Sequence, residues 1–575
     1  MILKALYDYY NRCDNMPAYG MEEKQIGFLL VIDHSGKFLR FEDCRIDKDT
    51  AKTFLVKKMI GRTSAVAPNY LYDNSSYVFG YSTKENGKEQ QCFDAFKAEV
   101  ESIAQQFPEN DDLKALCLFY ENSRDEILNE LERDTLWSEV IKNLGKKFSF
   151  FSFRIEGDTK IIAQKREILQ LEVPVSSGDG TSICLVSGIK GVPVETTTAT
   201  MVPGSQATAK LVSFQVSSGY DSYGKKKGYN APISEAAEFA YTTALNTLLS
   251  KNSRNKFSVG TRTFVFWASS SEKAALQAED ALFSMLGFVE NTDDPNANIE
   301  NVRKVFNGIY SGSIKTSLDD KFYILGLAPN AARIAVAYWS ETTLRDFAGM
   351  ILQHFDDMEV IDTRKEKRPY MGLRDILGAV TLSKKHTDAT PNLPDAVVKS
   401  IFQGLPYPYT LFASAIRRIR AEQEVSFYGG PCRVAIIKAY LNRLNDTNNK
   451  KLDIMLDEEN TNQGYLCGRL FATLEKIQED ANHMSTIRER YMNAASATPA
   501  AVFATLLNLS SHHSEKLNAG AKIYYEKIKQ EIIDKIMSDG FPAHLDLQDQ
   551  GRFFVGYYHQ RQDFFTSKNV NNEQE

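Results

Sequence analysis

The feature that most constrains how this chain can fold is a change of pattern after Trp339. Before that residue, short alternating apolar runs separated by turn residues predict strands and hairpins. After it, apolar residues recur three and four positions apart, which predicts helices at 341–357, 372–382, 393–403, 410–422 and 430–444. We therefore expect an α+β protein: a mixed N-terminal region with β-hairpins and helices, followed by helical segments and a C-terminal helical bundle.

Two hairpins are expected in the N-terminal region. Residues 26–33 and 37–41 are apolar runs on either side of a His34-Ser35-Gly36 turn, and residues 322–339 alternate around Ala328-Pro329-Asn330. Further strands are expected at 148–155 and 263–268, and helices within 92–120 and after Ser234.

At 575 residues the chain is too long for a single hydrophobic core. Residues 446–463 are polar, charged and short of apolar periodicity, so we interpret them as a linker. The expected parts are a mixed region at 1–340, a helical region at 341–445, this linker, a helical bundle at 464–566 and a disordered tail at 567–575.

Composition narrows the class of protein. No apolar run approaches the roughly 20 residues that span a bilayer, and the N-terminal residues carry tyrosines and charges where a signal peptide has an apolar core. A cytoplasmic protein is therefore expected. The net charge of −6 does not favour a free-standing nucleic-acid-binding protein, and it fits a subunit that contacts nucleic acid over part of its surface.

The segment from Lys57 to Gly80 is the first candidate binding region. Cations, small hydroxyls, amides and aromatic residues crowd into it without helical or strand periodicity, so neighbours, water or a partner must satisfy its polar groups. Cations neutralise phosphates, hydroxyls hydrogen-bond them, and amides can contact base edges. The candidate contacts are Lys57, Lys58, Arg62, Thr63, Ser64, Asn69 and Asn74. An ordinary ordered loop remains the alternative.

A second candidate is the run Lys225-Lys226-Lys227, which has glycines and tyrosines on both sides. It is the sharpest basic and aromatic cluster in the chain, and its lysines would suit a phosphate backbone. A solvated charge run is the alternative interpretation.

Recognisable catalytic motifs are missing from the sequence. It contains no phosphate-binding GxxxxGK(S/T) loop, no HExxH and no GxSxG, and its seven cysteines are scattered without a CxxC or Cys/His cluster. His386 and Asp388 form an isolated HxD, and His512, His513 and His559 are interpreted as surface or cap residues. We therefore expect no cofactor, no metal site and no catalysis.

Several long stretches, taken together, resemble a known family. MILKALYDYY, KKMIGRTSAVAPNYLYDNSSYVFG, SYGKKKGYNAPISEAAEFAYTTALNTLL and FYILGLAPNAARIAVAYW are similar to the large subunit of the type I-C CRISPR surveillance complex, Cascade. GLPYPYTLFASAIRRIRAEQ, GYLCGRLFATLEKIQEDA and GYYHQRQDFF resemble its C-terminal half, so the likeness runs almost end to end in the same order.

The resemblance implies a non-catalytic subunit of an RNA-guided complex, in which guide pairing reads the target sequence. It implies recognition of a protospacer-adjacent motif in double-stranded target DNA, help in unwinding that DNA into an R-loop, and a hold on the displaced single strand. The implied partners are the crRNA, the crRNA-capping subunit at its 5′ handle, the backbone subunits, small subunits and a helicase-nuclease. Members of the family can also make a separate small subunit from an internal start, for which Met455 is the candidate here.

The assignment of these roles to residues is our hypothesis. Lys57, Lys58 and Arg62 would hold phosphates, and Asn69 or Asn74 would reach a base edge in the minor groove. The three lysines at 225–227 are the next choice. Two alternatives stay open: a nucleic-acid-processing enzyme with a concealed metal site, and a protein-only scaffold whose basic clusters are solvated surface.

Overall fold

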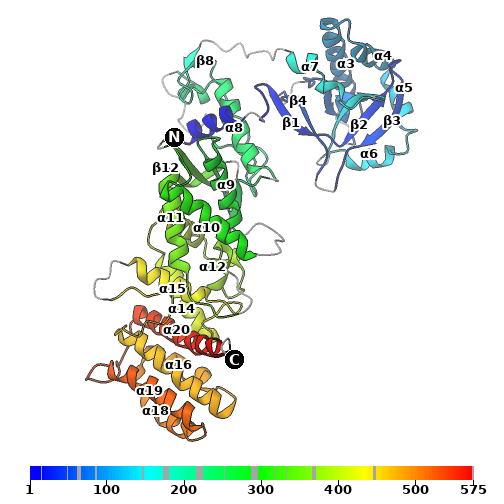
Figure 1. The fold of residues 1–575 in the computed structure, drawn as a ribbon. Coiled ribbons are helices and arrows are strands. Elements are labelled where there is room, and N and C mark those ends of the chain that lie inside the picture. Colours follow the sequence, from blue (N-terminus) through cyan, green and yellow to red (C-terminus); the bar gives the residue numbers. More distant parts are fainter. Residues whose placement is uncertain are drawn as a thin grey trace. The chain divides into compact units, whose positions relative to one another are not determined.

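The computed structural model describes residues 1–13, 16–47, 50–60, 66–83, 87–145, 148–171, 181–214, 224–251, 253–286, 295–317, 319–331, 333–364, 371–444 and 449–572 (Figure 1). It confirms the α+β class. The chain forms two compact units, each made of separate chain segments. Unit 1 is Met1–Arg12, Thr196–Asp221 and Ala244–Glu575, and unit 2 is Cys13–Glu195 and Ser222–Thr243.

Unit 2 is built around a four-stranded sheet in the order β3-β2-β6-β5. Its strands are β2 (Phe28–Ile32), β3 (Phe38–Asp43), β5 (Tyr72–Asn74) and β6 (Phe150–Ile155). β2 and β3 form the expected hairpin, whereas β2 and β6 pair in parallel. A parallel pair needs a long crossover, which here includes α3 (Glu89–Gln106), α4 (Asp111–Phe119), α5 (Arg124–Leu131) and α6 (Trp137–Asn143). Every residue of β2 is buried, as the continuous apolar run of a central strand predicts.

The remaining elements of unit 2 are short. β1 (Met21–Gln25) and β4 (Thr53–Lys57) form an antiparallel pair, and β7 (Ser182–Ile183) and β8 (Lys190–Gly191) form a small hairpin. α2 (Ser75–Val78) follows β5, and α7 (Arg166–Gln170) follows β6. α8 (Glu235–Leu249) begins in unit 2 and ends in unit 1.

Unit 1 contains a four-stranded antiparallel sheet in the order β12-β11-β10-β9. Its strands are β9 (Lys256–Val259), β10 (Arg262–Ala268), β11 (Lys321–Asn330) and β12 (Arg333–Thr343). The last two confirm the second expected hairpin, but Ala328, Pro329 and Asn330 are not its turn: they pair with β12 and extend β11 to Asn330. α9 (Lys273–Met285), α10 (Pro295–Ser311) and α11 (Leu344–Met358) share a core with this sheet. Within that core the rings of Phe322 and Phe347 stack at 4.3 Å.

The N-terminal helix α1 (Ile2–Arg12) docks onto unit 1 from far away in the sequence. The Tyr9 ring lies 6.2 Å from that of Trp267 on β10. Arg12 donates from Nη1 to the carbonyl oxygen of Ser270, 258 residues along the chain, at 2.5 Å. Aromatic packing and this charged hydrogen bond therefore hold α1 to the strand that precedes α9.

The second half of unit 1 is helical, as the change of pattern after Trp339 predicts (Figure 1). Its helices are α12 (Leu373–Ala379), α13 (Leu393–Phe402), α14 (Tyr409–Glu422), α15 (Cys432–Arg443), α16 (Gln463–Asn482), α17 (Ile487–Ala497), α18 (Pro499–Ser514), α19 (Ala519–Asp534) and α20 (Leu547–Asn572). One apolar core continues from the sheet through to α20.

Glycines let α16 and α20 approach backbone to backbone. A Cβ atom added at Gly468 would lie 2.0 Å from the carbonyl oxygen of Phe553, and one added at Gly556 would lie 2.3 Å from that of Tyr465. Carbon and oxygen cannot approach so closely without overlap, so only glycine fits at these positions. Large aromatic residues on both helices fill the space beside this contact.

The segment interpreted as a linker is held by polar contacts where the structure describes it, from residue 449 onward. The Asn442 side chain exchanges two hydrogen bonds with the Leu452 backbone, both 2.8 Å long. Lys450 pairs with Asp457 at 2.7 Å, and the Asn462 side chain caps α16. Hydrogen bonds and an ion pair thus fix this stretch. Such polar contacts need no regular spacing of apolar residues, so the sequence pattern did not reveal them. At the other end, α20 runs to Asn572, into the segment expected to be a disordered tail.

Among the described residues, no helix is both long and apolar enough to cross a bilayer.

Candidate nucleic-acid interface

Lys57, the last residue of β4, points its charge into the protein. Its side chain is buried, and its ammonium group donates to the carbonyl oxygen of Leu171. Burial lowers the pKa of this amine, because a desolvated ammonium is harder to keep charged. In this structure Lys57 is therefore turned away from any phosphate at the surface.

Asn69 lies at the base of the segment that contains Arg62, Thr63 and Ser64, three candidates that fall outside the described residues. Asn69 is fully buried, its Oδ1 accepts the Ile60 N–H at 2.8 Å, and its own N–H donates to Asp73 at 2.9 Å. Its Nδ2 has no hydrogen-bond partner among the residues that the structure describes. Asn69 thus fixes the chain where it enters the 61–65 segment, and its amide N–H₂ is the donor left over.

Asn74 ends β5 and begins α2. Its Oδ1 accepts the Ser76 N–H at 3.0 Å, so the side chain is an N-cap that satisfies one of the free donors of the helix. Asn74 therefore plays the role of the alternative interpretation, an ordinary turn residue that caps a helix. A base contact would have to use the amide nitrogen of the same side chain.

Lys58 reaches from the Lys57–Gly80 segment to α8. Its ammonium group lies 3.9 Å from the Glu238 carboxylate and 5.2 Å from the centre of the Phe239 ring. Glu238 is buried, whereas Lys58 keeps about a third of its side chain exposed, at 33%. The structure therefore brings one predicted phosphate contact to the helix that follows the Lys225–Lys227 run.

The Lys225–Lys227 run forms a rigid turn that leads into α8. Lys227 begins a short 3₁₀ helix and pairs with Glu195 at 2.6 Å, while the Asn230 amide donates to the carbonyl oxygens of Lys225 and Lys227. Gly228 packs so tightly on the Val194 carbonyl that a Cβ atom would lie 2.3 Å from the oxygen. Among the described residues, Lys225 and Lys226 form no ion pair and are exposed. The turn thus offers two free lysines on a fixed backbone.

The β7–β8 hairpin packs against the start of α8 and is not among the sites expected from the sequence. Leu185 donates from its backbone N–H to the carbonyl oxygen of Pro232, which fixes the hairpin to the start of α8. Ile183, Leu185 and Ile189 are more than half exposed, at 61%, 58% and 65%. Only the alternation within SICLVSGIK hints at this hairpin, and it is too short to distinguish from a Ser/Gly loop.

The sulfur of Cys184 anchors the same hairpin. Sγ accepts the backbone N–H groups of Val186, Ser187 and Ser234 at 3.3–3.4 Å. Burial alone would raise the pKa of this thiol, but the hydrogen bonds from Ser187 and Ser234 outweigh it and lower the pKa to about 7. The sulfur therefore ties the hairpin to the first residue before α8.

In the described part of the chain, no three His, Cys, Asp or Glu side chains come together in a way that could hold a metal ion.

The interpretation of His559 as a surface residue is wrong. Its ring is 1% exposed and lies 3.1 Å from the Tyr465 hydroxyl, inside the contact of α16 with α20.

One family model matches almost the whole chain, over residues 6–565. It is described as CRISPR-associated protein (Cas_Csd1). No curated protein matches the chain.

Proposed function

The chain belongs to the CRISPR-associated Cas_Csd1 family, the large subunits of type I-C Cascade complexes, and from that premise we propose that it recognises the protospacer-adjacent motif in duplex DNA. In this proposal it also promotes unwinding and R-loop formation, holds the displaced strand and helps to recruit the helicase-nuclease. The observation that carries the proposal is the end-to-end family match, from residue 6 to residue 565.

The geometry of unit 2 supports duplex contact at the start of α8. Lys225 and Lys226 are exposed on a hydrogen-bonded turn that leads into α8, and Lys58 lies against Glu238 and Phe239 in the first turn of that helix and the residue after it. Cations on a fixed backbone lose little freedom when they bind phosphates, and they give affinity without sequence preference. These three lysines are the proposed phosphate contacts.

Motif reading is assigned to the 60–69 segment. Asn69 holds Ile60, and between them the sequence carries Arg62, Thr63 and Ser64, whose side chains donate to phosphates and to the acceptors of the minor groove. Asn69 acts in this proposal as a positioning residue, with its amide nitrogen as a further donor. Such a degenerate readout suits a protein that leaves the rest of the target to guide pairing.

The partners follow from the family. A Cascade large subunit assembles with other Cas subunits, and we propose the crRNA, the capping subunit, the backbone subunits and small subunits as the direct neighbours. The chain acts in this role without catalysing a reaction and in the cytoplasm.

Reconstitution tests the proposal. A complex assembled with this chain should bind and unwind duplexes that carry the correct flanking motif, and a complex without it should retain the crRNA but fail on duplex targets. Single-stranded targets, which need no unwinding, are the control because guide pairing alone can capture them. Equal duplex binding with and without the chain would refute the proposal.

A further inference from the structure

A tight turn in unit 1 carries an exposed aromatic ring at its tip. The backbone N–H and C=O groups of Phe427 and Gly430 bond to each other at 2.8 and 3.0 Å, which leaves Tyr428 and Gly429 as the two turn residues. Their φ angles are +48° and +77°, the combination that a type I′ turn requires. Asn-Gly is the pair that suits this backbone, whereas tyrosine is strained in it. Even so, the Tyr428 side chain is 69% exposed.

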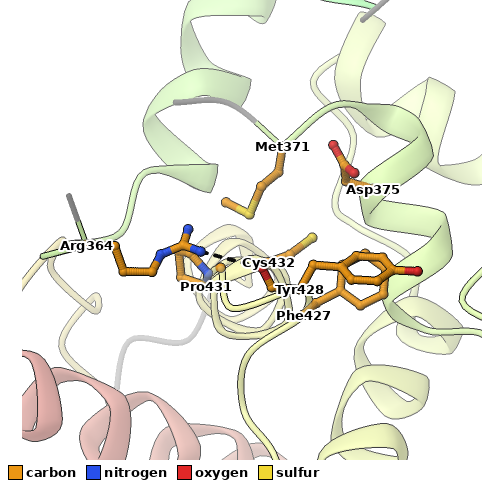
Figure 2. Close-up of a pocket in the computed structure, with 8 residues that line it drawn as sticks. Arg364, Met371, Asp375, Phe427, Tyr428, Pro431 and Cys432 are labelled. Carbon is orange, nitrogen blue, oxygen red and sulfur yellow. Dashed lines mark hydrogen bonds between the residues drawn. The ribbon is translucent and has the colours of Figure 1, made fainter. Parts of the chain in front are cut away.

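Arg364 holds this turn in place, as Figure 2 shows. Its guanidinium is fixed by Asp362 through bonds of 2.9 and 2.6 Å, and it lies against the turn backbone. A Cβ atom at Gly429 or Gly430 would come within 2.9 or 3.1 Å of its Nη atoms. The hollow between Arg364, the turn and α12 has room for about 20 Å³, the size of one water molecule. A larger ligand must therefore use the exposed ring and not the hollow.

The base of the turn is just as firmly built. Phe427 is buried, and its ring lies 5.8 Å from the guanidinium of Arg433. Arg433 is itself fully buried and donates to the carbonyl oxygens of Glu424 and Ser426 at 2.9 and 3.2 Å. The strained backbone at Tyr428 is thus held from both sides, which is how strain persists at functional positions.

One exposed lysine lies beside the ring, and a second follows it in the chain. The Lys384 ammonium lies 5.6 Å from the centre of the Tyr428 ring, and among the described residues neither Lys384 nor Lys385 forms an ion pair. Close to these lysines in the sequence, burial lowers the pKa of His386, and the charge of the exposed Arg374 on α12 adds to the effect.

The neighbouring acids are engaged within the fold. Asp375 accepts the Gly372 N–H at the start of α12, and Asp388 is bonded by the hydroxyls of Ser383 and Thr387. Asp362 is taken up by Arg364. Lys384 is therefore the charged group placed against the Tyr428 ring, and Lys385 follows it in the chain, while the exposed Asp388 keeps its negative charge.

We propose that Tyr428 stacks an unpaired base of a single-stranded nucleic acid while Lys384 and Lys385 contact the phosphates beside it. Exposed aromatic rings among cations are the arrangement by which proteins hold single strands. A duplex keeps its base faces stacked on one another, so it offers nothing to such a ring. The proposed role in holding a displaced strand identifies one source of this ligand, and the chemistry of the site would serve an RNA end equally.

The test separates stacking from turn stability in the full chain. Tyr428→Asn removes the ring and places a residue that suits the left-handed backbone, so the melting temperature should stay the same or rise. Affinity for a fluorescent single strand of about 15 nucleotides should fall roughly tenfold or more, because stacking is worth 1–3 kcal/mol per base. Tyr428→Trp should retain or improve binding, and duplex binding should change with neither variant. DNA and RNA versions of the probe distinguish the two sources.

A photochemical readout reports the contact directly. An oligonucleotide that carries 5-iodouracil should crosslink to the peptide containing Tyr428 in the wild type, and Lys384→Ala with Lys385→Ala should flatten the salt dependence of binding. Unchanged single-strand affinity in Tyr428→Asn would overturn the proposal. So would a variant that binds the oligonucleotide normally but no longer retains a Cas subunit, since the ring would then be a protein contact. Because the isolated chain and a single strand suffice, failure here leaves duplex recognition untouched.

Discussion

Gly468 on α16 and Phe553 on α20 meet backbone to backbone, with space for a hydrogen atom but not for a methyl group between them. α16 is buried along most of its length, so neither helix can move outward to make room. This contact therefore sets how closely the two central helices of the terminal bundle can pack.

Gly468→Ala should destabilise unit 1. The added Cβ would lie 2.0 Å from the Phe553 carbonyl oxygen, and overpacking a rigid site costs about 1–3 kcal/mol or more. Chemical unfolding should show a lower midpoint. Gly520→Ala is the matched control, since Gly520 on α19 is exposed and its nearest contact would be 3.6 Å away. That variant should be neutral or slightly stabilising, and equal loss in both would contradict the packing argument.

Replacement of Lys225 and Lys226 by alanine should weaken binding of all duplexes alike. Each lysine that neutralises a phosphate adds about 0.9 to the slope of log affinity against log salt, so the double variant should lose up to about 1.8. Titrations of the assembled complex at several salt concentrations measure this slope. Lys142→Ala removes an exposed lysine that pairs with Glu139 on α6, and it should leave the slope as it is. A double variant with the wild-type slope would remove these lysines from the interface.

Asn69→Ala should reduce discrimination between correct and incorrect flanking motifs. The change leaves the Ile60 N–H without its acceptor and loosens the entry to the 61–65 segment. Asn74→Ala is the comparison variant, because it removes the N-cap of α2 and should cost about 1 kcal/mol of stability without touching the Ile60 N–H. Competition binding with two duplexes that differ only in the motif gives the readout. If both variants discriminate as the wild type does, the reader lies elsewhere, and the lysines at 225–227 come next.

Acid should destabilise unit 1 through two buried histidines. Burial lowers the pKa of His354 and of His559 to about 3, with Arg443 and Lys438 adding to the respective effects. An unfolded histidine titrates near 6.5. Both groups are therefore neutral when folded and take up protons on unfolding, so stability present above pH about 6.5 is lost as the pH falls toward 3.

Each of these histidines should contribute about 1.4 kcal/mol per pH unit within that window. Denaturant unfolding between pH 7 and pH 5 measures the slope of the unfolding free energy against pH. His354→Gln should reduce that slope by the contribution of one proton, about 1.4 kcal/mol per pH unit. The same change at the exposed His512 is the control. An unaltered slope in His354→Gln would mean that His354 does not bind a proton on unfolding.

A second product should begin near Met455 and appear as a small subunit. Met455 is 57% exposed, so Met455→Leu should abolish the product without harming the full chain. In the full chain, Gly551 of α20 packs on Phe412 and Ile437, and the Tyr558 hydroxyl bonds to the Ile361 carbonyl oxygen. The shorter product lacks those partners, so we expect it to be retained only in the assembled complex. Intact-mass measurement of the purified complex decides the matter.

Local patterns predicted most elements of this fold. The second hairpin and the helices after Trp339 could be read from the sequence because alternation and apolar spacing are local signals. The turn of that hairpin was placed too early, because Ala328, Pro329 and Asn330 pair within the ladder as the end of β11. The parallel pairing of β2 with β6 could not, since nothing in either strand specifies a partner more than a hundred residues away. Burial of His559 was missed for a related reason: α20 is covered on several sides, so its sequence carries no clear polar face.

The candidate site was predicted less well than the fold. Composition could locate the Lys225–Lys227 turn, but it could not show that Lys227 is paired while Lys225 and Lys226 are free. Nor could it show that Lys57 faces inward, because a lysine after an apolar strand is ordinarily exposed. Orientation depends on contacts such as Leu171, which are distant in the sequence.

The docking of α1 onto β10 has a consequence for synthesis. α1 leaves the ribosome before β10, and the Ser270 carbonyl that accepts the hydrogen bond from Arg12 follows 258 residues later. At about 5–20 residues per second, the helix waits on the order of 10–50 s with its apolar side uncovered. Nascent chains arrested before β10 emerges should therefore be the ones that chaperones capture.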